Sequence, residues 1–196
     1  MATVEAPIPT QIRLHEGPFV NEPLVDFTRE ENARKMRAAI EKVRALLGRE
    51  YDLIIGGQRV RTAEKIKSIN PSKPSQIVGL HQKAGRDHVE PAMQAALSAF
   101  ASWSQTSFEE RASLLFRVAD VLRERKFEFC AWLVFEVSKN WAEADADIAE
   151  TIDFAEYYAR EALRLSRTEL PVQMPGEHDT LTYIPLGVGA VIPPWN

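Results

Sequence analysis

The sequence has little cysteine, no long apolar run and no excess of basic residues. A single cysteine, Cys130, among 196 residues excludes an internal disulfide and a cysteine-rich zinc cluster, and it fits a reducing compartment. The longest apolar runs fall far short of the ~20 residues that a membrane-spanning helix needs. Lys plus Arg number 24 against 28 Asp plus Glu, for a net charge of −4. We therefore expect neither a nucleic acid nor a membrane as a partner.

The first twenty residues lack the pattern of a targeting segment. They contain Glu5, Glu16 and three prolines, without a basic start followed by an apolar core. They also lack the Arg-rich amphipathic pattern of a transit peptide. Since no targeting pattern is apparent, we expect a cytoplasmic protein. Apolar residues make up an ordinary 45% of the chain, which indicates a globular one.

Residues 1–27 are rich in proline and polar side chains, so we expect an extended arm that lies on something else, or a loose tail. A helix should follow from Thr28 to Gly48. Thr28 and Glu31 have the spacing of a capping box, and a glycine is typical just beyond a helix C-terminus. The arm is therefore separate from the unit formed by residues 28–196.

Residues 51–61 predict a β-hairpin, because Gly56 and Gly57 stand between apolar stretches and permit the positive φ angles of a tight turn. Two more short strands are expected at residues 68–71 and 77–81.

Apolar residues at helical spacing predict three further helical stretches. The second of them begins at a capping-box pair, Ser107 and Glu110, and helix continues over residues 127–139. The third spans about residues 142–166. The expected core stripes are Val89, Met93, Leu97 and Phe100; Leu114, Leu115, Val118 and Leu122; and Ile148, Ile152, Ala155, Ala159 and Ala162.

The end of the sequence favours strands. Residues 180–184 alternate in polarity, and residues 188–192 form a short β-branched apolar run that suits a buried parallel strand. A parallel strand needs neighbours joined by crossover connections, and the helices carry more apolar surface than the expected hairpins cover. We therefore expect the N-terminal piece of a longer α/β protein.

The helix expected at residues 142–166 is rich in acids. Acids three or four positions apart share a helix face, and the residues alone favour a solvated face. A metal site is disfavoured because no histidine lies among them, while paired catalytic carboxylates stay an alternative. The acids are Glu143, Asp145, Asp147, Glu150, Asp153 and Glu156.

Other candidate site residues are isolated in the sequence. The four histidines are scattered without metal-ligand spacing, so no metal is expected. Cys130 lies in an apolar helical stretch, which favours a buried, inert thiol over a nucleophile. Gly187 and Gly189 are only a fragment of a dinucleotide-binding fingerprint.

The terminal segment places a tryptophan and an amide just past the expected last strand. In open α/β sheets, ligands bind beyond the carboxyl ends of the strands. An asparagine NH₂ group can donate a hydrogen bond to a developing oxyanion. Asn196 is therefore a candidate catalytic residue.

Residues 188–196 resemble the strand and Pro-Trp-Asn motif of the aldehyde dehydrogenase superfamily. Residues 19–27 and 138–158 look like its glutamate-semialdehyde branch. The resemblance implies an α/β fold, the N-terminal part of an aldehyde dehydrogenase. It would comprise the helical shell and first strand of the cofactor-binding domain, plus part of the oligomerisation strands. Residues 28–196 would then be an incomplete cofactor-binding domain with oligomerisation hairpin segments.

The resemblance also implies an activity, the oxidation of L-glutamate 5-semialdehyde to glutamate with NAD in proline degradation. In this family a cysteine thiolate attacks the aldehyde, and an asparagine, here Asn196, helps to hold the resulting oxyanion. Ile192, Pro194 and Trp195 match positions that border the cofactor. Glu150 matches an acid of the substrate tunnel, where it would meet the substrate's ammonium group.

The family's catalytic cysteine, general-base glutamate and cofactor-phosphate loop all follow the Pro-Trp-Asn motif, and Cys130 does not match the nucleophile. We therefore expect this chain to be inactive alone and to act on a small aldehyde within a complete enzyme, a homo-oligomer. The alternatives are a non-catalytic piece that docks onto intact subunits, and another semialdehyde branch of the superfamily.

Overall fold

The computed structural model describes residues 14–167, 172 and 174–193. Helices and strands follow one another along the described chain without a repeat. Their order is α1 (Glu30–Arg44), β1 (Arg49–Tyr51), β2 (Leu53–Ile55), β3 (Gln58–Val60), β4 (Lys65–Asn70), β5 (Lys73–Gln82), the short 3₁₀ helix η1 (Arg86–His88), α2 (Val89–Trp103), α3 (Phe108–Glu124), α4 (Lys126–Val137) and α5 (Trp141–Ser166).

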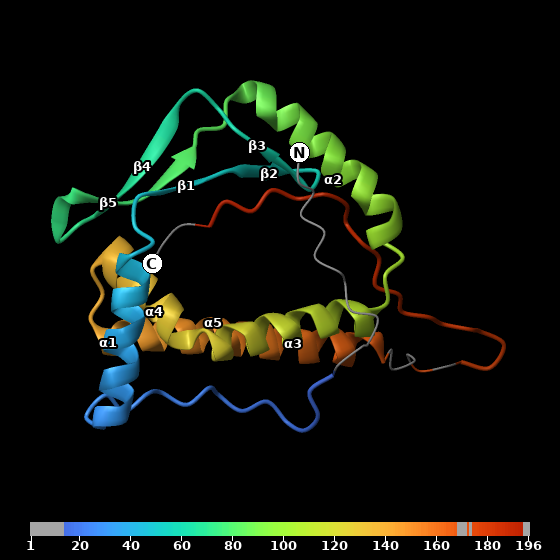
Figure 1. The fold of residues 1–196 in the computed structure, drawn as a ribbon. Helices are drawn as coiled ribbons and strands as arrows, with labels where there is room; N and C mark the ends of the chain where they lie inside the picture. Colours follow the sequence, from blue (N-terminus) through green and yellow to red (C-terminus); the bar gives the residue numbers. More distant parts are fainter. Residues whose placement is uncertain (1–13, 168–171, 173, 194–196) are drawn as a thin grey trace.

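Two long helices form the base of the molecule. Figure 1 shows α3 and α5 side by side, with the strands and α2 above them and α1 across one end. The main core lies between α1, α4 and α5, where Met36, Val43 and Ile152 are fully buried. Four of the five residues of the stripe expected at 148–162 are buried, so the stripe of α5 is confirmed.

The strands form two small sheets. In the first, β5 lies between β1, which is parallel to it, and β4, which is antiparallel. The second is the β2–β3 hairpin, in which Leu53 pairs with Val60. Its turn residues Gly56 and Gly57 have φ angles of 57° and 76°, so the predicted hairpin is confirmed. The parallel pairing of β1 with β5 was not apparent from sequence, because those strands are distant along the chain.

The first helix begins later than the capping-box pattern predicts. Its first residue is Glu30, and no side chain caps it. Thr28 donates its backbone N–H and its hydroxyl to Asp26, at 2.9 and 2.6 Å. The predicted capping box at Thr28 is wrong because a nearer carboxylate binds this threonine in a local turn.

The capping box predicted for the third helix is present. The backbone N–H of Glu110 donates to the Ser107 hydroxyl oxygen at 3.1 Å, and the N–H of Ser107 donates to the Glu110 carboxylate at 3.1 Å. These bonds satisfy N–H groups that have no partner within the helix, and α3 accordingly starts at Phe108.

The buried stripe of α3 differs from the predicted one. Leu115 and Val118 are exposed, the latter at 48%. The two possible stripes lie side by side on the helix and both have helical spacing, so periodicity alone cannot choose between them. The buried residues are Ala112, Ser113, Phe116, Ala119 and Leu122. The stripe predicted for α2 is also largely exposed, since none of the residues of that helix is buried.

The strands predicted near the end of the chain are absent from the described residues. Residues 180–184 and 188–192 have no regular secondary structure. Val191 and Ile192 are each 88% exposed. The prediction of a buried parallel strand is therefore wrong for this structure, because none of the described strands pairs with the segment through backbone hydrogen bonds.

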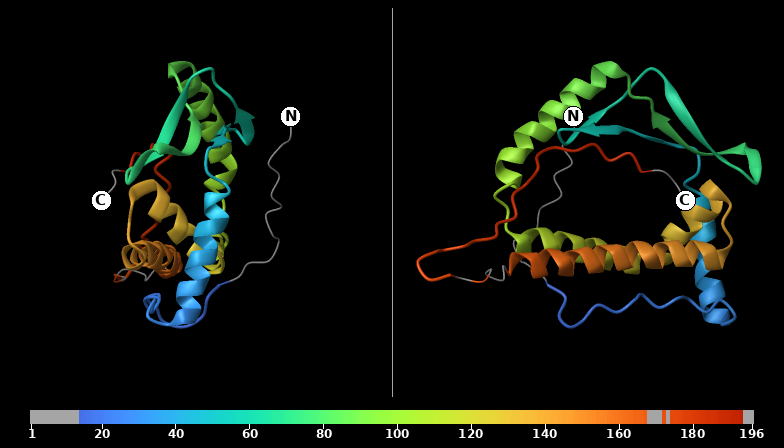
Figure 2. Two further views of the ribbon diagram at one scale, coloured as in Figure 1. Left: turned by 60° about the vertical axis from the view of Figure 1, so that its left-hand side comes forward. Right: turned by 180° about the vertical axis from the view of Figure 1, so that it is seen from behind.

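The described part of the arm lies along the base helices, below α3 and α5 in Figure 1 and in the right-hand view of Figure 2. The N–H of Val25 donates to Asp145 at 2.7 Å. The ammonium group of Lys126 lies 2.9 Å from the other Asp145 oxygen and donates to the Pro23 carbonyl at 3.1 Å. Asp145 is only 1% exposed, so its predicted place on a solvated face is wrong.

A second anchor of the arm is centred on Glu156, which is 4% exposed. His15 Nδ1 and Arg123 each lie 2.7 Å from its carboxylate, and Arg160 also donates to it. Arg123 donates in addition to Glu22 of the arm at 2.8 Å. Burial favours a higher pKa for Glu156, but the bonds from Arg160, Arg123 and His15 outweigh it and lower the pKa below its ordinary value.

Cys130 lies in the core on α4 and is a free thiol. Burial, with the nearby negative charge of Asp145, raises its pKa to about 12. The prediction of a buried, inert thiol is confirmed, because the thiolate is the reactive form and is almost absent at neutral pH.

The anchor at Glu156 predicts that the arm is released in acid. A group whose pKa is lowered by folding stabilises the fold fully above its unfolded value, 4.5, and this stabilisation is lost as the pH falls through the lower folded-state pKa. We expect the amides of residues 14–27 to lose protection from hydrogen exchange over that range, after correction for intrinsic rates. Glu156→Gln should remove this pH dependence, and an unchanged profile in that variant would contradict the assignment.

The burial of Cys130 predicts slow alkylation. With a pKa of about 12 instead of 9.0, the thiolate fraction at pH 8 falls by about 10³. Iodoacetamide should therefore modify the native protein about 10³-fold more slowly than the urea-unfolded protein, as followed by mass spectrometry. Equal rates in the two states would show that the thiol is accessible.

Candidate functional site

A groove of about 530 Å³ lies between the arm and α5. Its walls combine acidic and aromatic side chains from segments that are far apart in sequence. Those used below are Glu150, Asp153, Phe154, Tyr157 and Tyr158 from α5, and Phe19 from the arm. The helix brings these residues to one side because positions three or four apart are neighbours on its surface.

Glu150 is the exposed acid of the groove. Within the described parts of the chain, its carboxylate has neither a hydrogen-bond nor an ion-pair partner. It lies one helical turn before Asp153 and Phe154. An unpaired carboxylate beside aromatic faces is suited to bind an ammonium group, through a charged hydrogen bond and through the negative face of a ring.

Asp153 has a different role because the arm occupies both of its oxygens. The backbone N–H of Glu22 donates to one oxygen at 2.7 Å, and the amide NH₂ of Asn21 donates to the other at 2.7 Å. The solvated-face prediction is therefore wrong for Asp153. For Glu143 and Glu150, which are exposed, it agrees with the structure.

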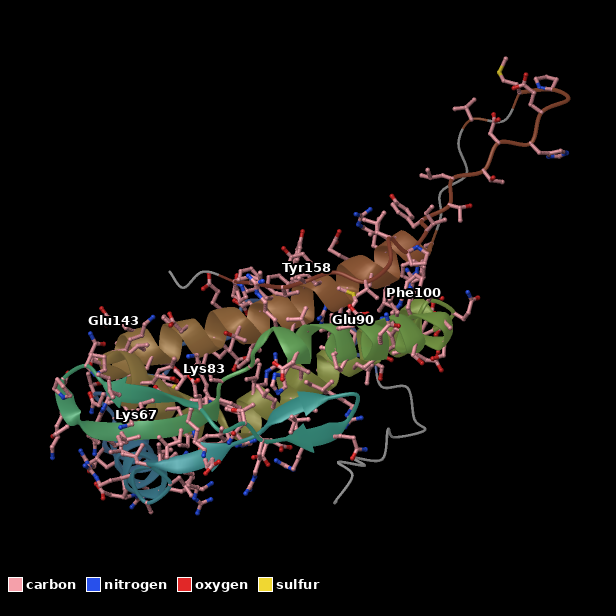
Figure 3. All side chains as sticks on the ribbon, turned by 90° about the horizontal axis from the view of Figure 1, so that it is seen from above. Lys67, Lys83, Glu90, Phe100, Glu143 and Tyr158 are labelled. Atoms are coloured by element: carbon pink, nitrogen blue, oxygen red, sulfur yellow. The ribbon has the colours of Figure 1, made fainter. Side chains whose placement is uncertain are left out.

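The aromatic residues pack against one another along the groove. The rings of Phe19 and Tyr157 meet edge to face, with centroids 5.6 Å apart. Phe154 and Tyr158 stack at 6.1 Å. Figure 3 shows that Tyr158 and Glu143 lie far apart along α5. Tyr158 lines the groove and Glu143 does not. These roles were missed from sequence, although three aromatics within one turn on the acidic helix, outside its apolar stripe, are a usable signal.

The other predicted site residues are not brought into the groove. Ile192 is not part of its lining, and its side chain is 88% exposed in an irregular segment. Pro194, Trp195 and Asn196 lie outside the described residues. That Ile192 borders the cofactor therefore stays a prediction.

The described residues hold neither a cluster of metal ligands nor a helix that could span a membrane. No group of three or more His, Cys, Asp or Glu side chains there is arranged to hold a metal ion. Across the same residues, every helix is too short or too polar to span a membrane.

Known proteins are similar to this chain both in sequence and in fold. The sequence profile described as the aldehyde dehydrogenase family matches residues 59–196. A 1-pyrroline-5-carboxylate dehydrogenase of Geobacillus thermodenitrificans is 53% identical over 180 residues, which are 91% of this chain and 35% of that protein. The chain thus spans about a third of the length of the curated relatives it matches.

Two solved structures resemble the fold. The 1-pyrroline-5-carboxylate dehydrogenase from Thermus with bound NAD has a TM-score of 0.79 and 48% identity, covering 83% of this chain and 32% of that one. The Delta-pyrroline-5-carboxylate dehydrogenase from Mycobacterium tuberculosis has a TM-score of 0.73 and 25% identity, covering 86% and 32%. The resemblance stated from the sequence and the α/β class are confirmed, and the chain belongs to the aldehyde dehydrogenase family.

Proposed function

We propose that this chain serves the NAD-dependent oxidation of L-glutamate 5-semialdehyde (1-pyrroline-5-carboxylate) to L-glutamate, as part of a complete aldehyde dehydrogenase. The observation that carries the proposal is the unpaired carboxylate of Glu150 in a groove with aromatic walls. The names of the similar proteins from Geobacillus and Thermus support the same substrate.

The substrate's own charge explains the choice of Glu150. The open-chain form of this amino-acid aldehyde carries an ammonium group on the carbon chain that ends in the reacting aldehyde. Glu150 binds that group, and the ring faces beside it add a weaker attraction for the same cation. A simple aliphatic aldehyde of similar size lacks the cation, so it gains nothing from this carboxylate. The groove thereby favours an amino-acid aldehyde over a neutral one.

The catalytic roles come from the family resemblance. Asn196 donates an N–H to the oxyanion that forms when a thiolate attacks the aldehyde. Ile192, Pro194 and Trp195 border the cofactor. Bound NAD would supply the hydride acceptor, and we assign no residue of this chain to the hydride transfer itself.

The wider organisation belongs to the same proposal. Residues 1–27 are the arm, and residues 28–196 are part of the cofactor-binding domain, with the β2–β3 hairpin contributing to an oligomerisation surface. The complete enzyme is a cytoplasmic homo-oligomer that takes a small aldehyde as its substrate.

The role of Glu150 predicts a selective loss of affinity. In the complete enzyme, Glu150→Gln should lower kcat/KM for the amino-acid aldehyde by about 10- to 100-fold, the usual value of a hydrogen bond to a charged group. For an aliphatic aldehyde of similar length, kcat/KM should change little. Glu143→Gln, which removes an exposed acid of the same helix outside the groove, is the matched control. An equal loss for both aldehydes would show that Glu150 does not recognise the ammonium group, and would favour the interpretation of a solvated acid.

The role of Asn196 predicts a loss of rate. In the complete enzyme, Asn196→Ala should lower kcat by about 10²–10³, because one donor to the oxyanion disappears. Substrate and NAD binding should persist, which titration of the variant can verify. An unchanged kcat would remove Asn196 from the mechanism.

A further inference from the structure

The arm forms one wall of the groove although residues 14–27 have no helix or strand of their own. Extended backbone without a sheet partner keeps its place only through contacts with other elements. The position of Phe19 and Asn21 opposite α5 therefore depends on the side chains that hold the arm. Among the described residues, the acids of α5 that receive hydrogen bonds from the arm are Asp145, Asp153 and Glu156.

Of these acids, Asp153 alone also lines the groove. Its two oxygens accept from two different kinds of donor, the backbone N–H of Glu22 and the side-chain amide of Asn21, each at 2.7 Å. A backbone bond fixes where the arm lies, and the adjacent side-chain bond fixes how it is turned. Both are charge-assisted bonds, which are the stronger class.

Asp153 also lies one helical turn from Glu150. The residue that binds the arm and the proposed acceptor of the ammonium group therefore belong to the same stretch of helix. Any change in how the arm is held at this point changes the wall that faces Glu150. Asp145, by contrast, holds the arm at Val25, and neither of these residues lines the groove.

We propose that Asp153 is a positioning residue, which fixes residues 19–24 against α5 and so shapes the groove for the amino-acid aldehyde. The proposal rests on the function proposed above for the groove. We assign Asp153 no contact with the substrate, since each of its oxygens already accepts a hydrogen bond from the arm. It acts on affinity through Phe19 and Asn21.

The first test uses Asp153→Asn in the complete enzyme. The introduced amide can still pair with the Glu22 N–H and, once the Asn21 amide turns over, with Asn21, but both bonds lose the negative charge that makes them strong. We expect KM for the amino-acid aldehyde to rise about ten-fold with kcat within about two-fold. Hydrogen exchange at the Glu22 amide should become faster in the same variant. An unchanged KM would overturn the positioning role.

The reciprocal double variant Asn21→Asp with Asp153→Asn restores a charged acceptor opposite an amide donor, with the partners exchanged. KM should return to within about two-fold of the starting enzyme, a recovery that a general loss of stability would not show. Failure of this recovery, with both variants folded, would overturn the proposal. Asp147→Asn is the matched control, because Asp147 lies on the same helix but binds Lys139 and does not line the groove.

The two proposals fail in different ways. If Glu150→Gln affects both aldehydes equally, the function proposed for the groove is wrong, whatever Asp153 does. If Glu150→Gln discriminates between them while Asp153→Asn leaves KM unchanged, the positioning role is wrong and the function stands.

Discussion

The hydrogen bonds between the carboxylates of α5 and the extended arm are the interaction on which the described structure depends. An arm without secondary structure has backbone N–H groups that need acceptors, and Asp145 and Asp153 supply them at Val25 and Glu22. A buried carboxylate is costly unless it is paired. Lys126 meets this requirement for Asp145, and it also donates to the Pro23 carbonyl, so the side chain that pairs the buried carboxylate also holds the arm.

This attachment makes the groove. Because the arm is held along α5, its residues face the exposed part of that helix, and an acid there can remain without a partner. Glu150 is that acid, and its neighbour Asp153 is committed to the arm. The acids of α5 thus have two roles. Asp145 and Asp153 hold the arm, and Glu150 stays available for the proposed binding of a charged aldehyde.

The sequence predicted most of the local structure and part of the site. It predicted the turn at Gly56 and Gly57 and the start of α3, because each depends on neighbouring residues. It predicted Glu150 only through a family resemblance, since spacing alone favoured a solvated face. It missed Asn21 and Asp153, because their bond joins residues separated by 132 positions, and no local pattern marks such a pair.

The sequence by itself determined where helices form, that Cys130 is buried, and, through the Pro-Trp-Asn segment at residues 188–196, the family. These features follow from local hydrogen bonding, from apolar spacing, or from a short motif. Only the tertiary structure decided which stripe of α3 is buried, which acids of α5 hold the arm, and that residues 188–192 form no strand here. Each of these depends on the partner that lies opposite in space, and a strand or a buried acid is stable only when that partner is present.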